Sequence, residues 1–332
     1  MLGPIAVLGA GSWGTALALH LAQNGNDVLL WGHNPQHVHA LLKQKENKRY
    51  IPGFPFPDTL TATASLKEAL TVARDVLLAI PSHAFQDTLD KIKQIDQDRP
   101  WRLIWVTKGL APSTGDFFHT MIQNTLPNVQ MAVLSGPSFA VEVAQRIPTA
   151  VTLAVNDAQW EQDLITRFHG PSFRLYTTND FVGVQLGGIV KNIIAIGVGI
   201  ADGLGNGANT RCALIARGLS EMRRLGAALG AKSETFMGLS GLGDLVLSCT
   251  DDQSRNRRFG LMLGQGMTMN NAIANIGQVV EGIKNTHLIV NLAKQHGVDM
   301  PICEQIHAIL EDRITPYEAV GALILRSQKK EA

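Results

Sequence analysis

Six residues near the start of the chain, Gly9-Ala10-Gly11-Ser12-Trp13-Gly14, constrain the fold more than any other segment. They form the pattern G-x-G-x-x-G between an apolar run at 5–9 and a helical pattern at 15–24. In a strand–turn–helix unit, the first glycine permits a tight turn, the second lets the backbone approach a pyrophosphate, and the third lets the helix pack closely on the strand. The N–H groups at the helix N-terminus then face the anion. We therefore predict a dinucleotide site lined by Gly9, Gly11, Ser12, Trp13 and Gly14. Without the flanking strand and helix, the same glycines indicate only a turn.

The first half of the chain alternates short apolar runs with amphipathic stretches, which is typical of βαβ units around a parallel sheet. Strands are predicted at 5–9, 28–31, 76–80, 103–107, 131–134 and 150–155, and helices at 15–24 and 35–45. After about residue 181 only helices are predicted, at 184–200, 210–229, 259–263, 269–276, 282–296, 302–311 and 316–326. We expect an α/β domain with a Rossmann-type parallel sheet over 1–182 and an all-α domain over 183–332. The active site is expected in the cleft between them.

Bulk properties restrict the class of protein. A chain of 332 residues is too long for one ordinary core. Its 29 basic and 28 acidic residues give a net charge of +1, which argues against binding of nucleic acid or an anionic membrane surface. The apolar stretch 189–208 is interrupted by Lys191, Asn192 and Asp202, so it is a poor membrane span. Three scattered cysteines, no basic leader and no ligand spacing predict a cytoplasmic protein with reduced thiols and no metal.

The end of the second predicted strand bears on the cofactor. NAD-selective sites usually place an acid there to bind the ribose hydroxyls. Here the strand ends in Trp31-Gly32-His33-Asn34, with no acid to repel a 2′-phosphate. The missing acid predicts NADPH or NADH as the cofactor, with NADPH favoured. His33 itself either borders the 2′-phosphate or is a solvent-exposed turn residue. A basic run follows the second helix and is either a solvated face or a phosphate-steering group: Lys43, Lys45, Lys48 and Arg49.

Two segments place polar groups just beyond predicted strands, where open α/β sheets bind ligands. Lys108 ends the first and can hold a ribose, a carbonyl oxygen or a phosphate, although a surface lysine is the alternative. The second, residues 134–140, leaves room for a cofactor ring and presents backbone donors, but a plain βα turn has the same composition.

Lys191 lies in an otherwise apolar helical pattern. A buried ammonium is costly unless it is paired or functional, and a lysine whose pKa falls through burial can act as a general acid and base. A snorkelling lysine at a domain boundary is the alternative. The glycine-rich segment 238–244 is predicted to be a loop ending in Asp244, which can pair with Lys191.

A basic run at 254–258 contains three arginines within four positions, Arg255, Arg257 and Arg258. Guanidinium groups bind phosphate through a planar fork, whereas a run of arginines is more commonly a solvated helix face. Glu281 precedes a glycine and can bind a ribose or an amide, or it is an ordinary acid at a helix start.

Taken together, these segments resemble bacterial-type NAD(P)-dependent glycerol-3-phosphate dehydrogenases. The resemblance rests on these segments, in the family's order and spacing over nearly the whole chain: GAGSWGTALA (9–18), VTKGL (106–110), LSGPSFA (134–140), VKNIIAIGVGIADGLGNGANT (190–210), GLSGLGDL (238–245), SRNRRFG (254–260) and VEG (280–282). It implies a helical second domain like that of 6-phosphogluconate dehydrogenase, a homodimer, and a supply of sn-glycerol 3-phosphate for phospholipid synthesis.

The resemblance also implies residue roles. Lys191 would be the catalytic proton donor and acceptor. The substrate, dihydroxyacetone phosphate or sn-glycerol 3-phosphate, would meet Lys108, Gly136, Ser138, Lys191, Asp244, Ser254, Arg255 and Asn256. The cofactor would also meet His33, Tyr50, Lys108, Ala140, Arg255, Val279 and Glu281.

Three competing functions are open to a chain with these features. A 3-hydroxyacyl-CoA dehydrogenase would need a His–Glu pair, and a nucleotide-sugar dehydrogenase would need a catalytic cysteine, for which Cys212 and Cys249 have no obvious partner. A non-catalytic NADPH sensor would have no reason to combine Lys191 and the arginine run with the glycine loop.

Overall fold

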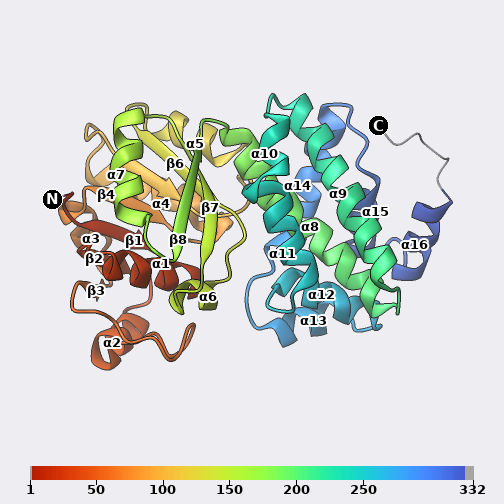
Figure 1. Ribbon diagram of the computed structural model, residues 1–332, viewed down its shortest axis with the longest axis horizontal. Coiled ribbons are helices and arrows are strands. Elements are labelled where there is room, and N and C mark those ends of the chain that lie inside the picture. The colour runs from red at the N-terminus through yellow and green to blue at the C-terminus, as the bar shows by residue number, and fades with distance from the viewer. Residues whose placement is uncertain (1, 326–332) are drawn as a thin grey trace. The chain divides into compact units, whose positions relative to one another are not determined.

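The computed structural model describes residues 2–325, and within it the chain divides into two compact units, Met1–Val184 and a second that begins at Gln185 (Figure 1). The seven C-terminal residues, including Arg326 at the predicted end of the last helix, lie outside the described part.

The first unit is built on one eight-stranded sheet, in the order β3-β2-β1-β4-β5-β6-β7-β8. The strands are β1 (Ile5–Leu8), β2 (Val28–Trp31), β3 (Leu60–Thr63), β4 (Asp75–Leu78), β5 (Arg102–Trp105), β6 (Gln130–Ser135), β7 (Thr149–Val155) and β8 (Phe173–Thr178). All neighbours are parallel except β6 and β7, which are antiparallel with Ala132 opposite Val155. The predicted parallel sheet is confirmed but for this pair, where the chain turns back after one short helix.

Helices cover both faces of this sheet (Figure 1). They are α1 (Ser12–Gln23), α2 (Pro35–Gln44), α3 (Leu66–Val72), η1 (Ser82–Ala84), α4 (Phe85–Ile95), α5 (Phe118–Thr125), α6 (Ala140–Ala144) and α7 (Ala158–Phe168). Strand β1 is buried throughout: Ile5 and Val7 join the core under α1 and α7, while Ala6 and Leu8 join the core under α3, α4 and α5. This is why the sequence of β1 is a continuous apolar run rather than an alternating one.

A buried ionic network joins β4, β5 and α7. The Asp75 carboxylate is fully buried and lies 2.6 Å from Arg167 Nε and 2.9 Å from Arg102 Nε. It also accepts a 2.9 Å hydrogen bond from Trp160 Nε1. Because both Asp75 oxygens have partners, this buried carboxylate charge is fully paired.

The second unit is helical, and none of its residues 185–325 forms a strand, which confirms that part of the prediction. Its helices are α8 (Phe181–Gly203, which starts in the first unit), α9 (Ala208–Ala228), α10 (Ser233–Met237), the π turn η2 (Leu239–Gly243), α11 (Asp244–Thr250), α12 (Arg255–Gly264), α13 (Met269–Ile276), α14 (Glu281–Gln295), α15 (Pro301–Leu310) and α16 (Pro316–Ile324).

The prediction of a loop over 238–244 is wrong, because this segment is the π turn and the start of α11. Its glycines serve close packing. A Cβ on Gly241 would lie 2.2 Å from the Phe236 carbonyl oxygen, and one on Gly187 would lie 2.3 Å from that of Ser240. Glycines, which commonly indicate a turn, here allow two segments of backbone to lie in direct contact.

Helices α8 and α12 meet along a seam of four glycines. A Cβ on Gly199 or Gly203 of α8 would lie 2.1 or 2.4 Å from a carbonyl oxygen of α12. A Cβ on Gly260 or Gly264 of α12 would lie 2.1 or 2.3 Å from a carbonyl oxygen of α8. The absence of side chains on both sides lets the two backbones touch.

Helix α8 is the one helix of the described chain that is long and apolar enough to cross a membrane, and 83% of its most apolar window is buried in the protein. Length and composition alone make this weak evidence for a span, since a core helix has the same properties.

Candidate active site

The glycine loop has the shape that a dinucleotide pyrophosphate requires. Gly9 has φ +126°, and a Cβ there would lie 2.3 Å from the Ala79 carbonyl oxygen. A Cβ on Gly14 would lie 1.9 Å from the Gly9 carbonyl oxygen. Gly11 is different, because no atom lies within 4 Å of a Cβ placed there. Two glycines thus close the turn while the third leaves open space at the N-cap of α1, so the residues fit the predicted cofactor.

A second segment holds this loop in place, and the sequence did not single out its main residue. The buried Asn47 side chain donates to the Ala10 carbonyl (3.0 Å) and to Thr15 Oγ1 (2.8 Å). The Ser12 hydroxyl donates to the Tyr50 carbonyl at 3.0 Å. These bonds bring the Tyr50 backbone to the glycine loop, and they commit the Ser12 hydroxyl to the protein. Trp13 is half-buried against the core.

The residues that directly follow β2 are Gly32, His33 and Asn34, none of them acidic. His33 is exposed, and Asn34 caps α2 by accepting from the amides of Gln36 and His37. A cavity of about 460 Å³ opens beside it, between α2 and residues 46–49. Its lining includes Lys48 and Arg49 but also Glu46, so the surroundings are mixed in charge.

Beyond the next strands lie the residues that the resemblance assigns to the nicotinamide side. Lys108 is half-buried after β5. Gly136 follows β6 with φ +150°, and a Cβ there would lie 3.0 Å from Val151 Cα. Ser138 donates to the Gly136 carbonyl at 3.0 Å, and Ala140 begins α6.

Lys191 forms the most distinctive polar centre of the second unit. The residue is only 8% exposed on α8, in a core of Ile, Val and Ala side chains. Its Nζ donates to Asp244 Oδ1 at 2.8 Å and to Ser248 Oγ at 2.7 Å. The predicted pairing with Asp244 is confirmed, and Ser248, one turn later on α11, is a partner that the sequence reasoning missed. Its spacing of four residues from Asp244 was the available signal.

Cys249 lies next to this centre, and its surroundings disfavour the thiolate that a nucleophile needs. Burial raises the pKa of the Cys249 thiol to about 12, although the charges of Lys191 and Arg257 oppose the shift. A thiol in this state carries no significant thiolate near neutral pH, which argues against the cysteine-dependent alternative.

Asn256 connects three helices beside Lys191. Its Nδ2 donates to Asn192 Oδ1 at 2.9 Å, and its Oδ1 accepts from the Gly282 amide at 3.1 Å. The Asn192 side chain in turn donates to the Gly188 carbonyl. Because Asn192 immediately follows Lys191 on α8, this chain fixes the start of α12 and of α14 relative to the lysine.

The three arginines of α12 have separate environments. Arg257 is buried and pairs with Asp202 at 2.7 Å and with Asp252, so the alternative of a solvated helix face does not hold for this residue. Arg255 donates to Gln278 Oε1 at 3.2 Å; burial lowers the pKa of its guanidinium, and the nearby Glu281 carboxylate opposes that shift. Ser254 uses its hydroxyl to cap α12. Val279 is exposed beside this group.

Comparison with known proteins identifies the family. The family model described as NAD-dependent glycerol-3-phosphate dehydrogenase N-terminus matches residues 4–161, and the corresponding C-terminus model matches 180–321. The glycerol-3-phosphate dehydrogenase (NAD(P)+) of Shewanella amazonensis is 51% identical over 329 residues, 98% of this chain and 97% of the relative. That of Erwinia tasmaniensis is 53% identical over 330 residues, 98% and 97% of the two chains.

Solved structures give the same grouping. A glycerol-3-phosphate dehydrogenase from Coxiella burnetii superposes with a TM-score of 0.95 at 50% identity, covering 98% of this chain and 99% of the other. D-mandelate dehydrogenase, at 16% identity and a TM-score of 0.65 over 96% and 99% of the two chains, shares the fold alone.

Proposed function

The chain belongs to the NAD(P)-dependent glycerol-3-phosphate dehydrogenase family, and we propose that Lys191 is the group that moves the proton in its reaction. The reaction interconverts dihydroxyacetone phosphate and sn-glycerol 3-phosphate. The observation that supports the role of Lys191 is its position: a buried ammonium on an apolar helix, held by one carboxylate and one hydroxyl. Such a residue is expensive to keep in a core unless its charge is used.

The chemistry divides between cofactor and protein. When bound, the nicotinamide ring supplies the hydride that goes to C2 of dihydroxyacetone phosphate. Lys191 donates a proton to the oxygen on C2 as negative charge develops there, and takes it back in the reverse direction. Asp244 and Ser248 fix the direction in which Nζ points, since each accepts a bond from it. Lys108 adds positive potential to the same oxygen.

The remaining residues bind and position. We assign the substrate phosphate to Arg255 with Asn256 and the Ser254 end of α12, because a guanidinium and the N–H groups of a helix N-terminus each favour an anion. Binding the phosphate holds the distant carbonyl in place for reaction. Gly136 and Ser138 border the substrate, and the cofactor edge comprises Ala140, Arg255, Val279 and Glu281. The two compact units then correspond to a cofactor domain and a substrate domain.

For the cofactor we propose a preference for NADPH over NADH. The support is the absence of an acid after β2 and the presence of His33, Lys48 and Arg49 around that strand end. A carboxylate there would repel the 2′-phosphate, and these side chains do not.

We also propose that the protein is a cytoplasmic homodimer whose product feeds phospholipid synthesis, on the strength of the family resemblance. Light scattering after size-exclusion chromatography tests the dimer: a mass near 36 kDa would contradict it, since one chain has a mass of 35.9 kDa.

Replacement of Lys191 tests the central assignment. Lys191→Ala is expected to lower kcat by about 10²- to 10⁴-fold, the usual contribution of a positioned acid and base. NADPH binding, followed by its fluorescence, should change little, and circular dichroism should confirm folding. Lys67→Ala, an exposed lysine on α3, is the control and should retain full activity. A Lys191→Ala enzyme that keeps more than roughly a tenth of the wild-type kcat would contradict the assignment.

A further inference from the structure

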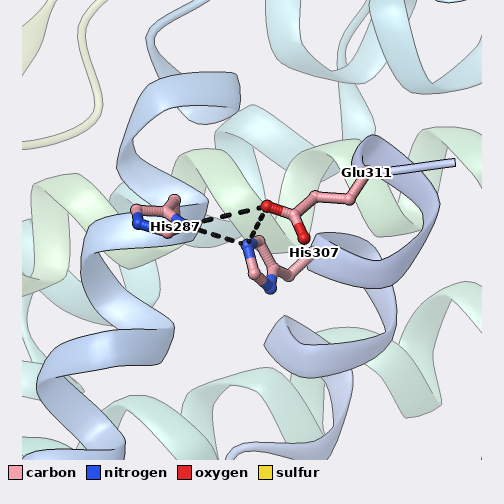
Figure 2. Close-up of side chains that lie close together, drawn as sticks. All are labelled: His287, His307 and Glu311. Atoms are coloured by element: carbon pink, nitrogen blue, oxygen red, sulfur yellow. Dashed lines mark hydrogen bonds and ion pairs between the residues drawn. The ribbon is translucent and has the colours of Figure 1, made fainter. Parts of the chain in front are cut away.

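We propose that His287, His307 and Glu311 form a binding site for one divalent transition-metal ion of the zinc class, which joins α14 to α15. The sequence spacing predicts no such cluster, but folding brings together an imidazole from α14, an imidazole from α15 and the carboxylate at the C-cap of α15 (Figure 2). This site goes beyond the proposed function and lies among none of the residues assigned to it.

The ligand atoms are already spaced as a bound ion requires. His287 Nδ1 lies 3.2 Å from His307 Nε2 and 3.8 Å from Glu311 Oε1, and His307 Nε2 lies 3.1 Å from Glu311 Oε1. A triangle with these sides has a point about 2.0 Å from all three corners, which is the usual length of Zn–N and Zn–O bonds. No movement of the backbone is needed to place an ion there.

The ligand types select the metal. Two imidazoles and one carboxylate suit Zn²⁺, Ni²⁺ or Cu²⁺, and they match three-ligand zinc sites whose fourth position holds water. Mg²⁺ and Ca²⁺ prefer six or more oxygen ligands and would find one carboxylate here. His287 and Glu311 are 57% and 46% exposed while His307 is 10% exposed, so the site has one solvent-facing side for that water and for entry of the ion.

Neighbouring side chains complete the site. Asn291 Nδ2 lies 2.9 Å from His287 Nε2 and donates to it in the metal-free form. When Nδ1 binds a metal, Nε2 carries the proton, and the Asn291 amide must turn over so that its Oδ1 accepts that proton. Arg313 Nε lies 3.2 Å from Glu311 Oε2 and holds the carboxylate by its other oxygen.

A second contact must change on binding. Arg313 Nη2 lies 3.1 Å from His307 Nδ1, so in the metal-free form Nδ1 accepts and Nε2 carries the proton. That proton then points at Glu311 Oε1, 3.1 Å away, and a metal ion takes its place between the three ligand atoms. His307 Nδ1 must then become protonated, and the Arg313 guanidinium, which is 55% exposed, turns away from it.

Titration with ZnCl₂ tests the proposal on the full-length, chelator-treated enzyme. Isothermal calorimetry should show one Zn²⁺ per chain, with a rise in the unfolding temperature at saturation because the ion binds only the folded chain. His287→Ala and Glu311→Gln should each weaken binding by about tenfold or more. His287 is exposed, so its variant should fold normally. The matched control is His296→Ala, an exposed histidine at the end of the same helix, which should bind like the wild type.

Cys212 is exposed and can capture zinc by itself, so all titrations are repeated in a Cys212→Ser background. Loss of binding in His287→Ala within that background supports the site. Two results overturn it: no binding at 100-fold excess of Zn²⁺ over protein, or equal binding by His287→Ala, Glu311→Gln and the control. A crystal grown with Zn²⁺ should also show anomalous density between the three side chains.

Discussion

Gly260→Ala on α12 is expected to destabilise the second unit and to disturb substrate binding at the same time. The added Cβ would lie 2.1 Å from the Ile196 carbonyl oxygen, 2.9 Å from its carbon and 3.0 Å from the Ile200 amide nitrogen. All three are backbone atoms of α8, so no side chain can turn aside. To reach ordinary contact the two helices must separate by about 1 Å, and overpacking of this kind costs roughly 1–3 kcal/mol.

The separation should be visible in the kinetics because α12 begins at the site. Asn256, one turn before Gly260, bonds to Asn192 at 2.9 Å. A shift of about 1 Å in a substrate-positioning element can lower the rate by on the order of 10²-fold. We expect a higher KM for dihydroxyacetone phosphate and a lower kcat, with the Kd for NADPH unchanged. Urea denaturation measures the stability and the NADPH absorbance assay measures the kinetics.

The control is Gly321→Ala on α16, where a Cβ meets no atom within 4 Å. Alanine is a better helix former than glycine, so this variant should gain up to about 1 kcal/mol. A Gly260→Ala protein as stable and as active as the Gly321→Ala protein would refute the seam argument.

Three further outcomes are expected. Burial raises the pKa of the Glu221 carboxyl group to about 7. The folded chain therefore binds the carboxyl proton more tightly than the unfolded chain does. The stability that this proton contributes is present below pH 4.5 and is lost as the pH rises through about 7. In urea unfolding, this group should make the free energy of unfolding about 3 kcal/mol lower at pH 8 than at pH 5. Glu221→Gln should abolish this difference, and a variant that keeps the wild-type pH dependence contradicts the assignment. Asp75→Asn should lower the free energy of unfolding by about 3–5 kcal/mol, whereas Asp58→Asn, at an exposed position, should hardly change it. Equal unfolding midpoints for the two variants would show that the buried network does not depend on the Asp75 charge. His33→Asp should lower kcat/KM for NADPH by about tenfold relative to NADH, since a carboxylate repels the 2′-phosphate; an unaltered ratio would show that this strand end does not select the cofactor.

The sequence predicts best the strands that are buried on both faces of the sheet. Strands β1, β4 and β5 are buried on both faces and stand out as largely apolar runs, and the glycine loop between β1 and α1 is typical of a dinucleotide site. Strands β3 and β8 were not predicted. They lie at the two edges of the sheet, and part of each strand is exposed. Both sequences, LTAT and FRLYTT, therefore contain threonines among apolar residues, and the second also contains Arg174.

Within the site, the sequence pointed to individual candidate residues more readily than to the residues that hydrogen-bond with them. Lys191 was identifiable because it interrupts an apolar helix, and Asp244 because it ends a glycine-rich segment. Asn47 gave no signal, since an asparagine in a polar stretch is ordinary until the fold places it on the Ala10 carbonyl. The role of Arg257 stayed open, because its acidic partners, 5 and 55 residues away in the chain, are not evident from a run of arginines.

The burial of α8 has a consequence for how the chain is made. The elements that cover its middle follow it in sequence: a Cβ on Gly218 of α9 would meet Ile194, one on Gly260 of α12 would meet Ile196, and one on Gly197 would meet Ile306 of α15. During translation, α8 therefore leaves the ribosome as a long apolar helix roughly a hundred residues before its last partner exists. The nascent chain at this stage offers the membrane-insertion and chaperone machinery the same surface that the finished protein hides. Chains stalled shortly after α8 should thus be more prone to aggregation than chains stalled after α15.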